Sequence, residues 1–100
     1  MKTKREPVVH KVKCWPVNFN RWICRNKSFE IRRNDRDYRS GDTLVQEEWD
    51  PSLKEYTGRV GTGHVLYVME DQPGLQNGFC ILEVPFLKMI IKQQSHEDMG

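Results

Sequence analysis

The sequence lacks several features that would place a protein in a familiar class. It contains no apolar run near the length of about 20 residues that a membrane-spanning helix needs. Its N-terminus carries basic side chains but no apolar stretch of the kind found in secretory signals. P-loop, GxGxxG, HExxH and GxSxG motifs are missing too. These absences favour a small cytoplasmic domain without a membrane partner.

Cysteine is also scarce. Cys14, Cys24 and Cys80 are the three cysteines, and no two of them form a CxxC pair. An odd number without paired spacing favours free thiols in a reducing compartment over a disulfide framework. The three histidines are scattered as well, so no spacing predicts a zinc site. We therefore expect neither a metal nor another cofactor.

Charge, in contrast, is plentiful and unevenly distributed. The 100 residues carry 16 basic and 14 acidic side chains, for a net charge of +2. Residues 1–39 hold 12 basic and 4 acidic side chains, whereas residues 40–100 hold 4 basic and 10 acidic ones. Such asymmetry is typical of a protein with an anionic partner. Two halves that fold together and neutralise each other would explain the same pattern, so both interpretations stay open.

The hydrophobic pattern predicts one short helix and a series of strands. Residues 8–15 alternate as a strand does, and residues 16–25 begin with a proline and carry an apolar stripe typical of a helix. Further strands are expected over residues 27–33, 43–49, 59–69 and 79–84. This succession, with bends at Gly61 and Gly63, predicts a mainly β (α+β) fold that forms a small, partly closed β-barrel.

The remaining segments are expected to be connections and ends. Residues 50–58 and 70–78 contain turn chemistry and predict loops. Residues 1–7 are expected to be a flexible basic tail that precedes a domain over residues 8–84. Residues 85–100 form a C-terminal extension that begins as a helix or a strand and ends in a disordered segment.

The segment KSFEIRRNDRDYRSGD, residues 27–42, crowds charges of both signs around few apolar side chains. Strand alternation places Phe29 and Ile31 on one face, which we expect to be the core face. Glu30 and Arg32 would then lie on the opposite face, beside the helix, where a cleft could form. The residues expected to serve the turns and the fold are Asn34, Asp35, Gly41 and Asp42.

Four groups of residues together resemble a known superfamily. They are His10 with Lys13; the sixteen-residue pattern KxFEIRxNDRxYxxGD from Lys27 to Asp42; Tyr56-Thr57-Gly58-Arg59; and Gly74-Leu75 with Gly78. The chain is thereby similar to the ASCH domains, and in particular to a bacterial and phage branch of unknown function. The resemblance covers residues 8–84 and implies a PUA-like β-barrel that binds RNA or a modified nucleotide or nucleoside in a cleft beside the first helix.

The position of the cleft that the resemblance implies, together with side-chain chemistry, gives the candidate ligand-binding residues. They are Lys27, Ser28, Glu30, Arg32, Arg33, Arg36 and Trp15. Arginine forks suit phosphate or a base edge, and a glutamate can accept from an exocyclic amine. Other interpretations stay open: Lys27 could be a solvated strand end, and Glu30 with Arg32 a surface ion pair worth about 0–1 kcal/mol. Trp22 is expected to be a core residue, and Trp15 a stacking platform.

Two other functions remain alternatives. Another ASCH branch contains amidohydrolases that cleave N4-acetylcytidine, with a catalytic lysine at the position of Lys27 and a threonine nucleophile at that of Glu30. A glutamate could act only as a general base or an acceptor, and the helical segment with the family's acidic partner is missing from this shorter chain. The second alternative is a small phage-type module that docks a protein partner. We expect a monomer or a weak dimer.

Overall fold

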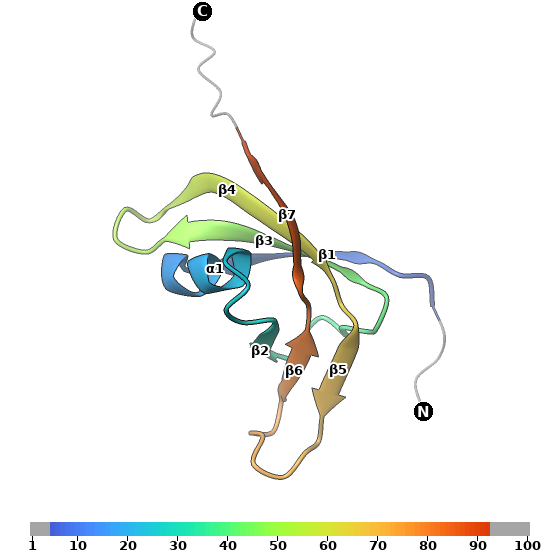
Figure 1. The fold of residues 1–100 in the computed structure, drawn as a ribbon. Helices are drawn as coiled ribbons and strands as arrows, with labels where there is room; N and C mark the ends of the chain where they lie inside the picture. Colours follow the sequence, from blue (N-terminus) through green and yellow to red (C-terminus); the bar gives the residue numbers. More distant parts are fainter. Residues whose placement is uncertain (1–4, 93–100) are drawn as a thin grey trace, which may run out of the picture.

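The computed structural model describes residues 5–92, which form one helix and seven strands in two sheets (Figure 1). The elements are β1 (Val9–Cys14), α1 (Pro16–Ile23), β2 (Phe29–Arg33), β3 (Thr43–Asp50), β4 (Glu55–His64), β5 (Tyr67–Glu70), β6 (Phe79–Glu83) and β7 (Phe86–Ile91). The predicted class, mainly β with one short N-terminal helix, is confirmed. The described helix is too short to span a membrane.

The two sheets differ in size and pairing. The larger sheet has the order β1-β3-β4-β7, with β1 parallel to β3 and the other pairs antiparallel. The smaller, antiparallel sheet has the order β2-β6-β5. Figure 1 shows the long β3–β4 hairpin beside α1, with the smaller sheet at the other end of the molecule. Within residues 5–92 no strand pairing joins the two sheets, so they do not form a closed barrel.

The predicted long strand over residues 59–69 is in fact two strands in different sheets. β4 ends at His64 and β5 begins at Tyr67. Between them Val65 is almost completely buried, and its backbone donates to Asp42 and accepts from Gly41. These two backbone bonds, together with burial of the Val65 side chain in the core, hold the chain in a bend between β4 and β5. The chain thus passes from one sheet to the other at Val65.

One other segment differs from expectation and one is decided by the structure. The expected connection at residues 50–58 already contains the start of β4 at Glu55. The segment after Pro85, expected to be a helix or a strand, is a strand, because β7 pairs with β4, with Ile90 opposite Val60. The C-terminal residues expected to be disordered lie outside the described part of the chain. So do the first four residues of the expected N-terminal tail.

Helix α1 packs on the larger sheet through Trp22. This side chain is fully buried, as predicted, and its indole N–H donates to the carbonyl of Val84 over 2.7 Å. Gly61 and Gly63 lie beneath the ring. A Cβ at Gly61 would lie 2.6 Å from the indole, and one at Gly63 would lie 3.1 Å from it. The two glycines, predicted as bends, therefore make room for the tryptophan.

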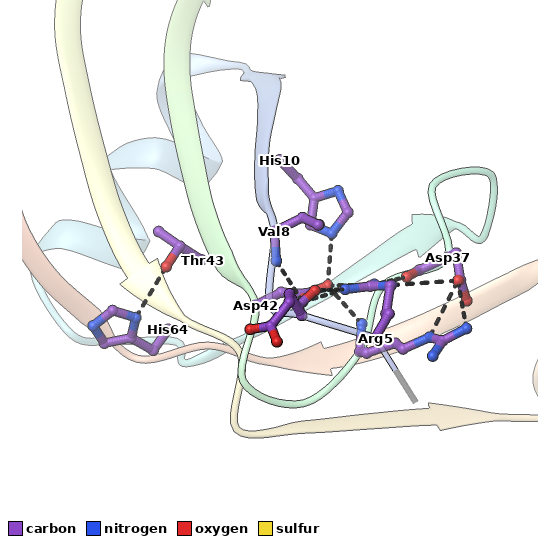
Figure 2. Close-up of polar contacts among 9 residues, drawn as sticks. Arg5, Val8, His10, Asp37, Asp42, Thr43 and His64 are labelled. Carbon is purple, nitrogen blue, oxygen red and sulfur yellow. Dashed lines mark hydrogen bonds and ion pairs between the residues drawn. The ribbon is translucent and has the colours of Figure 1, made fainter. Parts of the chain in front are cut away.

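A buried carboxylate anchors the start of the chain. Asp42 is fully buried and accepts hydrogen bonds from Arg5, from His10 and from the backbone N–H groups of Val8 and Arg39 (Figure 2). Burial by itself raises the pKa of Asp42, but these hydrogen bonds outweigh it and hold the pKa below its ordinary value. Asp42, predicted to be a structural residue, thus ties residue 5, β1 and the turn before β3 together.

Candidate ligand-binding site

Strand β2 points its side chains the opposite way from the prediction. Glu30 is only 5% exposed, whereas Phe29 is 56% and Ile31 64% exposed. The predicted orientation is therefore wrong. The interior position facing β2 is occupied by Gln46 of β3, which is fully buried and hydrogen-bonds Glu30. A polar partner inside the protein makes the polar face of β2 the inner face.

Four residues form a continuous polar chain through this interior. Lys27 Nζ lies 3.2 Å from Glu30 Oε2, and the amide N–H of Gln46 donates to the same oxygen over 2.8 Å. Arg32 Nη2 donates to Gln46 Oε1 over 2.8 Å and to the carbonyl of Lys13 over 3.1 Å. We call Lys27, Glu30, Gln46 and Arg32 the polar chain. Because the amide of Gln46 is bonded at both ends, its orientation and that of Arg32 are fixed.

A pocket of about 490 Å³ opens where the polar chain ends at Arg32. It lies along β1 and β2, the edge strands of the two sheets, with further walls from the β2–β3 connection, β3, β4 and β6. Five basic side chains line it, which are Lys11, Lys13, Arg32, Arg33 and Arg36. Two acids, Asp35 and Glu47, and three aromatic residues, Tyr38, Tyr56 and Phe79, also line it. We call this the cationic pocket.

Aromatic rings hold two of these cations in place. The ammonium of Lys13 lies 3.9 Å from the ring centroid of Trp49 and 5.9 Å from that of Tyr56, and these two rings pack edge to face. The guanidinium of Arg33 lies 5.0 Å from the ring centroid of Phe79. Cation–π contacts of this kind keep a charge at a defined position while leaving its donors available. The positions of these two charges in the pocket wall are therefore defined by the rings beside them.

Tyr38 connects the cationic pocket to the anchor around Asp42. Its side chain is buried, and its ring packs edge-on against His10 at 4.7 Å between centroids. Burial raises the pKa of Tyr38. The phenol therefore stays protonated at neutral pH and can act as a hydrogen-bond donor.

The predicted ligand residues are divided among three hollows. Lys27 and Glu30 line a pocket of about 260 Å³ next to Asn18 of α1, which is the place predicted for the cleft. Arg32, Arg33 and Arg36 line the larger cationic pocket instead. Ser28 lines a shallow hollow of about 330 Å³ on the smaller sheet. Trp15, at the start of α1, is 59% exposed.

Of the residues predicted to serve the turns, Asn34 makes side-chain and backbone bonds. Its amide donates to Glu70 and its backbone N–H to the carbonyl of Gly78, which joins the end of β2 to the β5–β6 connection. Gly41 has a φ of 98°, which favours glycine. Asp35, in contrast, faces the cationic pocket.

Sequence reasoning missed several residues of the site. Lys11, Lys13, Tyr38 and Tyr56 line the pocket without having been named as ligand residues. Gln46 was missed as well, although a signal existed, because it stands at the buried position between Leu44 and Glu48 in an alternating strand. A polar residue at such a position requires a hydrogen-bond partner, and here the partners are Glu30 and Arg32.

A second ion pair supports the helix side of the site. Arg59 binds both oxygens of buried Glu48 at 2.8 Å and also donates to Asn20 of α1. The hydrogen bonds from Arg59 lower the pKa of Glu48, against the effect of burial. This bond set fixes α1 on the β3–β4 hairpin.

Cys14 lines none of these three hollows. Burial and then the negative charge of Glu30 raise the pKa of Cys14 to about 12, so the thiol is protonated at neutral pH.

These features define a small, mainly β domain with a cationic, partly aromatic pocket lined by both of its sheets. The chain belongs to the DUF3850 family, described as a domain of unknown function, which matches residues 9–84. The comparison with curated proteins gave no match. The matched region contains all residues of the polar chain and of the cationic pocket, whereas β7 lies beyond it.

Proposed function

We propose that the protein binds RNA, or a nucleotide or nucleoside, in the cationic pocket. The observation that carries the proposal is the combination of five basic and three aromatic side chains around about 490 Å³. Lysine and arginine neutralise phosphates, and aromatic faces stack on bases. Small-ligand sites are commonly about 300–1,000 Å³ in volume, so one nucleotide can enter.

Arg32 is the residue best suited to read the ligand. Its Nη2 is held by Gln46 and by the carbonyl of Lys13, while its buried Nε has no hydrogen-bond partner within residues 5–92. Arg32 also lines the cationic pocket, so an acceptor on the ligand can reach the part of its guanidinium that faces the pocket. Asp35 and Glu47, the acids of the pocket, can accept from an exocyclic amine of a base. In this arrangement Lys27 and Glu30 act through Gln46 and position Arg32.

We further propose that this DUF3850 domain is a branch of the ASCH superfamily, and that its two sheets correspond to a PUA-like barrel. The sixteen-residue motif and the order of one helix followed by strands favour this relationship. Both sheets also share one core, which includes Leu44 of β3 and Leu82 of β6, and this agrees with a relationship to the ASCH superfamily. An ASCH relationship agrees with binding of single-stranded RNA or a modified nucleoside better than with duplex binding.

Hydrolysis of an N4-acetylcytidine-like nucleoside is the second candidate. Lys27 and Glu30 lie side by side against the 260 Å³ pocket, which favours this reading. However, the amide of Gln46 and the ammonium of Lys27 both bind Glu30 Oε2, so this oxygen is already occupied by two donors and is poorly placed to take a proton from a water molecule. We therefore expect no appreciable turnover of N4-acetylcytidine. Robust turnover that disappears in Lys27→Ala would reverse the order of the two proposals.

A titration of labelled single-stranded RNA and of nucleoside monophosphates at several salt concentrations tests the main proposal. We expect RNA binding to fall steeply with salt, with a log–log slope of about 0.7 for each phosphate contact. Lys11→Glu should weaken binding, because this side chain lines the pocket. Lys88→Glu on β7 is the matched control, since it changes the net charge equally outside the pocket. No binding at low salt, or equal effects of both variants, would count against the proposal.

The remaining alternative is a protein-docking module of the phage type. It predicts a partner that binds with little salt dependence and that does not compete with RNA or nucleotides. A protein partner that binds the wild type, together with no binding of RNA or of a nucleoside monophosphate at low salt, would favour this alternative over the main proposal.

A further inference from the structure

The outer face of the smaller sheet exposes an ordered set of apolar and aromatic side chains. The strand register places Phe29, Glu83 and Tyr67 in one row across β2, β6 and β5. Ile31, Ile81 and Met69 form the next row. Phe29, Ile31 and Tyr67 are each more than half exposed, and a hollow of about 330 Å³ lies over the first row and part of the second. We call this surface the outer face.

The outer face is continuous with the cationic pocket. Ile31 belongs to the second row and also lines the pocket. The third row of the sheet, Arg33 opposite Phe79, is itself part of the pocket wall. A ligand that extends beyond the pocket therefore crosses Ile31 and reaches Phe29 and Tyr67 without a barrier of folded chain between them.

We infer that the outer face is a second subsite, which binds a base of a flanking nucleotide in single-stranded RNA. The inference rests on the proposed function and specifies its ligand as an oligonucleotide rather than a mononucleotide. Strands are about 4.8 Å apart, so the rings of Phe29 and Tyr67, two strands apart, lie roughly 10 Å from each other. Exposed aromatic residues on an open sheet can stack with unpaired bases of any sequence.

The charges around the outer face agree with this ligand. Arg33, in the third row of the sheet, is a cation beside the outer face, where a phosphate of the RNA would run. Glu83 lies between the two rings, where it repels phosphate and can accept from the exocyclic amine of a base. A protein partner fits less well, because the cores of protein interfaces are depleted in charged residues.

The test compares a short single-stranded RNA with a nucleoside monophosphate on the full-length protein. Tyr67→Ala should weaken RNA binding about 5- to 150-fold, the range for loss of one base–aromatic stack. Binding of the monophosphate should not change, because Tyr67 does not line the cationic pocket. Tyr67→Phe should bind RNA as the wild type does, and Tyr67→Leu should not, since it keeps apolar surface but removes the aromatic ring.

Leu87→Ala on β7 is the control, because Leu87 is similarly exposed at 52% and lies on the other sheet. Thermal melts of all variants should match that of the wild type. Equal RNA affinity in Tyr67→Ala and wild type would overturn the inference while leaving the proposed function intact if the monophosphate binds. A wild-type dimer that becomes monomeric in Tyr67→Ala would instead identify a self-association surface. Failure of both ligands to bind would reject the inference and the proposed function together.

Discussion

Two buried carboxylates in this small domain are used in different ways. Asp42 is completely buried and accepts bonds of 2.7–3.1 Å from Arg5, from His10 and from two backbone N–H groups. Glu30 is 5% exposed and accepts from Gln46 at 2.8 Å and pairs with Lys27 at 3.2 Å. The first set of partners fastens segments of the chain to one another. The second continues through Gln46 to Arg32, which faces a pocket.

The two carboxylates differ in whether their hydrogen bonds, and those of their partners, are all completed within the described chain. Asp42 receives donors from the chain start, from β1 and from its own turn, so its bonding is complete within the fold. Glu30 orients a neutral amide, which orients a guanidinium whose Nε has no partner in the described chain. A closed set of bonds stabilises the structure, whereas the open one leaves a buried donor unsatisfied, which is where we propose that a ligand acts.

Asp42→Ala should have the largest effect on stability. Removal of the carboxylate leaves Arg5, His10 and two backbone N–H groups without their acceptor, and breaking such a buried pair costs about 3–5 kcal/mol. Urea titration with circular dichroism measures the change in the free energy of unfolding. A loss below about 1 kcal/mol would mean that the anchor is not structural, and the comparison with Glu30 would fail.

Acid pH should reproduce part of the loss of stability that is expected for Asp42→Ala. Because hydrogen bonds lower the pKa of Asp42 in the folded state, its contribution is fully present above about pH 4 and is lost as the pH falls through the folded-state pKa. Thermal melts between neutral and acid pH should show this decrease. Asp42→Asn should be less stable at neutral pH and should show a flatter dependence on pH in that acid range. An unchanged pH profile in Asp42→Asn would contradict the assignment.

Gln46→Ala should have an intermediate effect on stability and a clear effect on binding. It removes one of the two partners of Glu30 and one of the two partners of Arg32, and leaves only Lys27 and the carbonyl of Lys13, which costs about 1–3 kcal/mol. It should also weaken RNA binding, because Arg32 is no longer oriented. Arg32→Ala should also lower the melting temperature, because it removes the donor to Gln46 Oε1. If Gln46→Ala lowers stability but leaves RNA affinity intact, the polar chain serves only the fold.

Arg36→Ala should have the smallest effect on the fold. The side chain is exposed and lines the cationic pocket, so the free energy of unfolding should change by less than about 0.5 kcal/mol. RNA binding should weaken, and the salt slope should fall by about 0.7 if Arg36 contacts one phosphate. An unchanged slope would place the RNA backbone elsewhere in the pocket.

The alternation of apolar and polar residues predicted where the strands lie better than it predicted which face of each strand is buried. In β1 the structure follows the alternation of the sequence, with His10 and Val12 buried and Lys11 exposed. In β2 the same reasoning failed, because Phe29 and Ile31 are exposed and Glu30 is buried. The rule that apolar side chains face inward assumes an apolar interior. Here Gln46 and Lys27 supply a polar one, and neither is a neighbour of Glu30 in the strand.

The sequence by itself determined the mainly β class, the helix after Pro16, most of the strands and the motif that identifies the anchor at Asp42. These features depend on alternation, turn chemistry and local spacing, which act over a few residues. Only the tertiary structure decided which face of β2 is buried, where the strand over residues 59–69 breaks, and which basic residues meet. The cationic pocket unites β1, β2, β3, β4 and β6, and such convergence depends on how two sheets pack around one core.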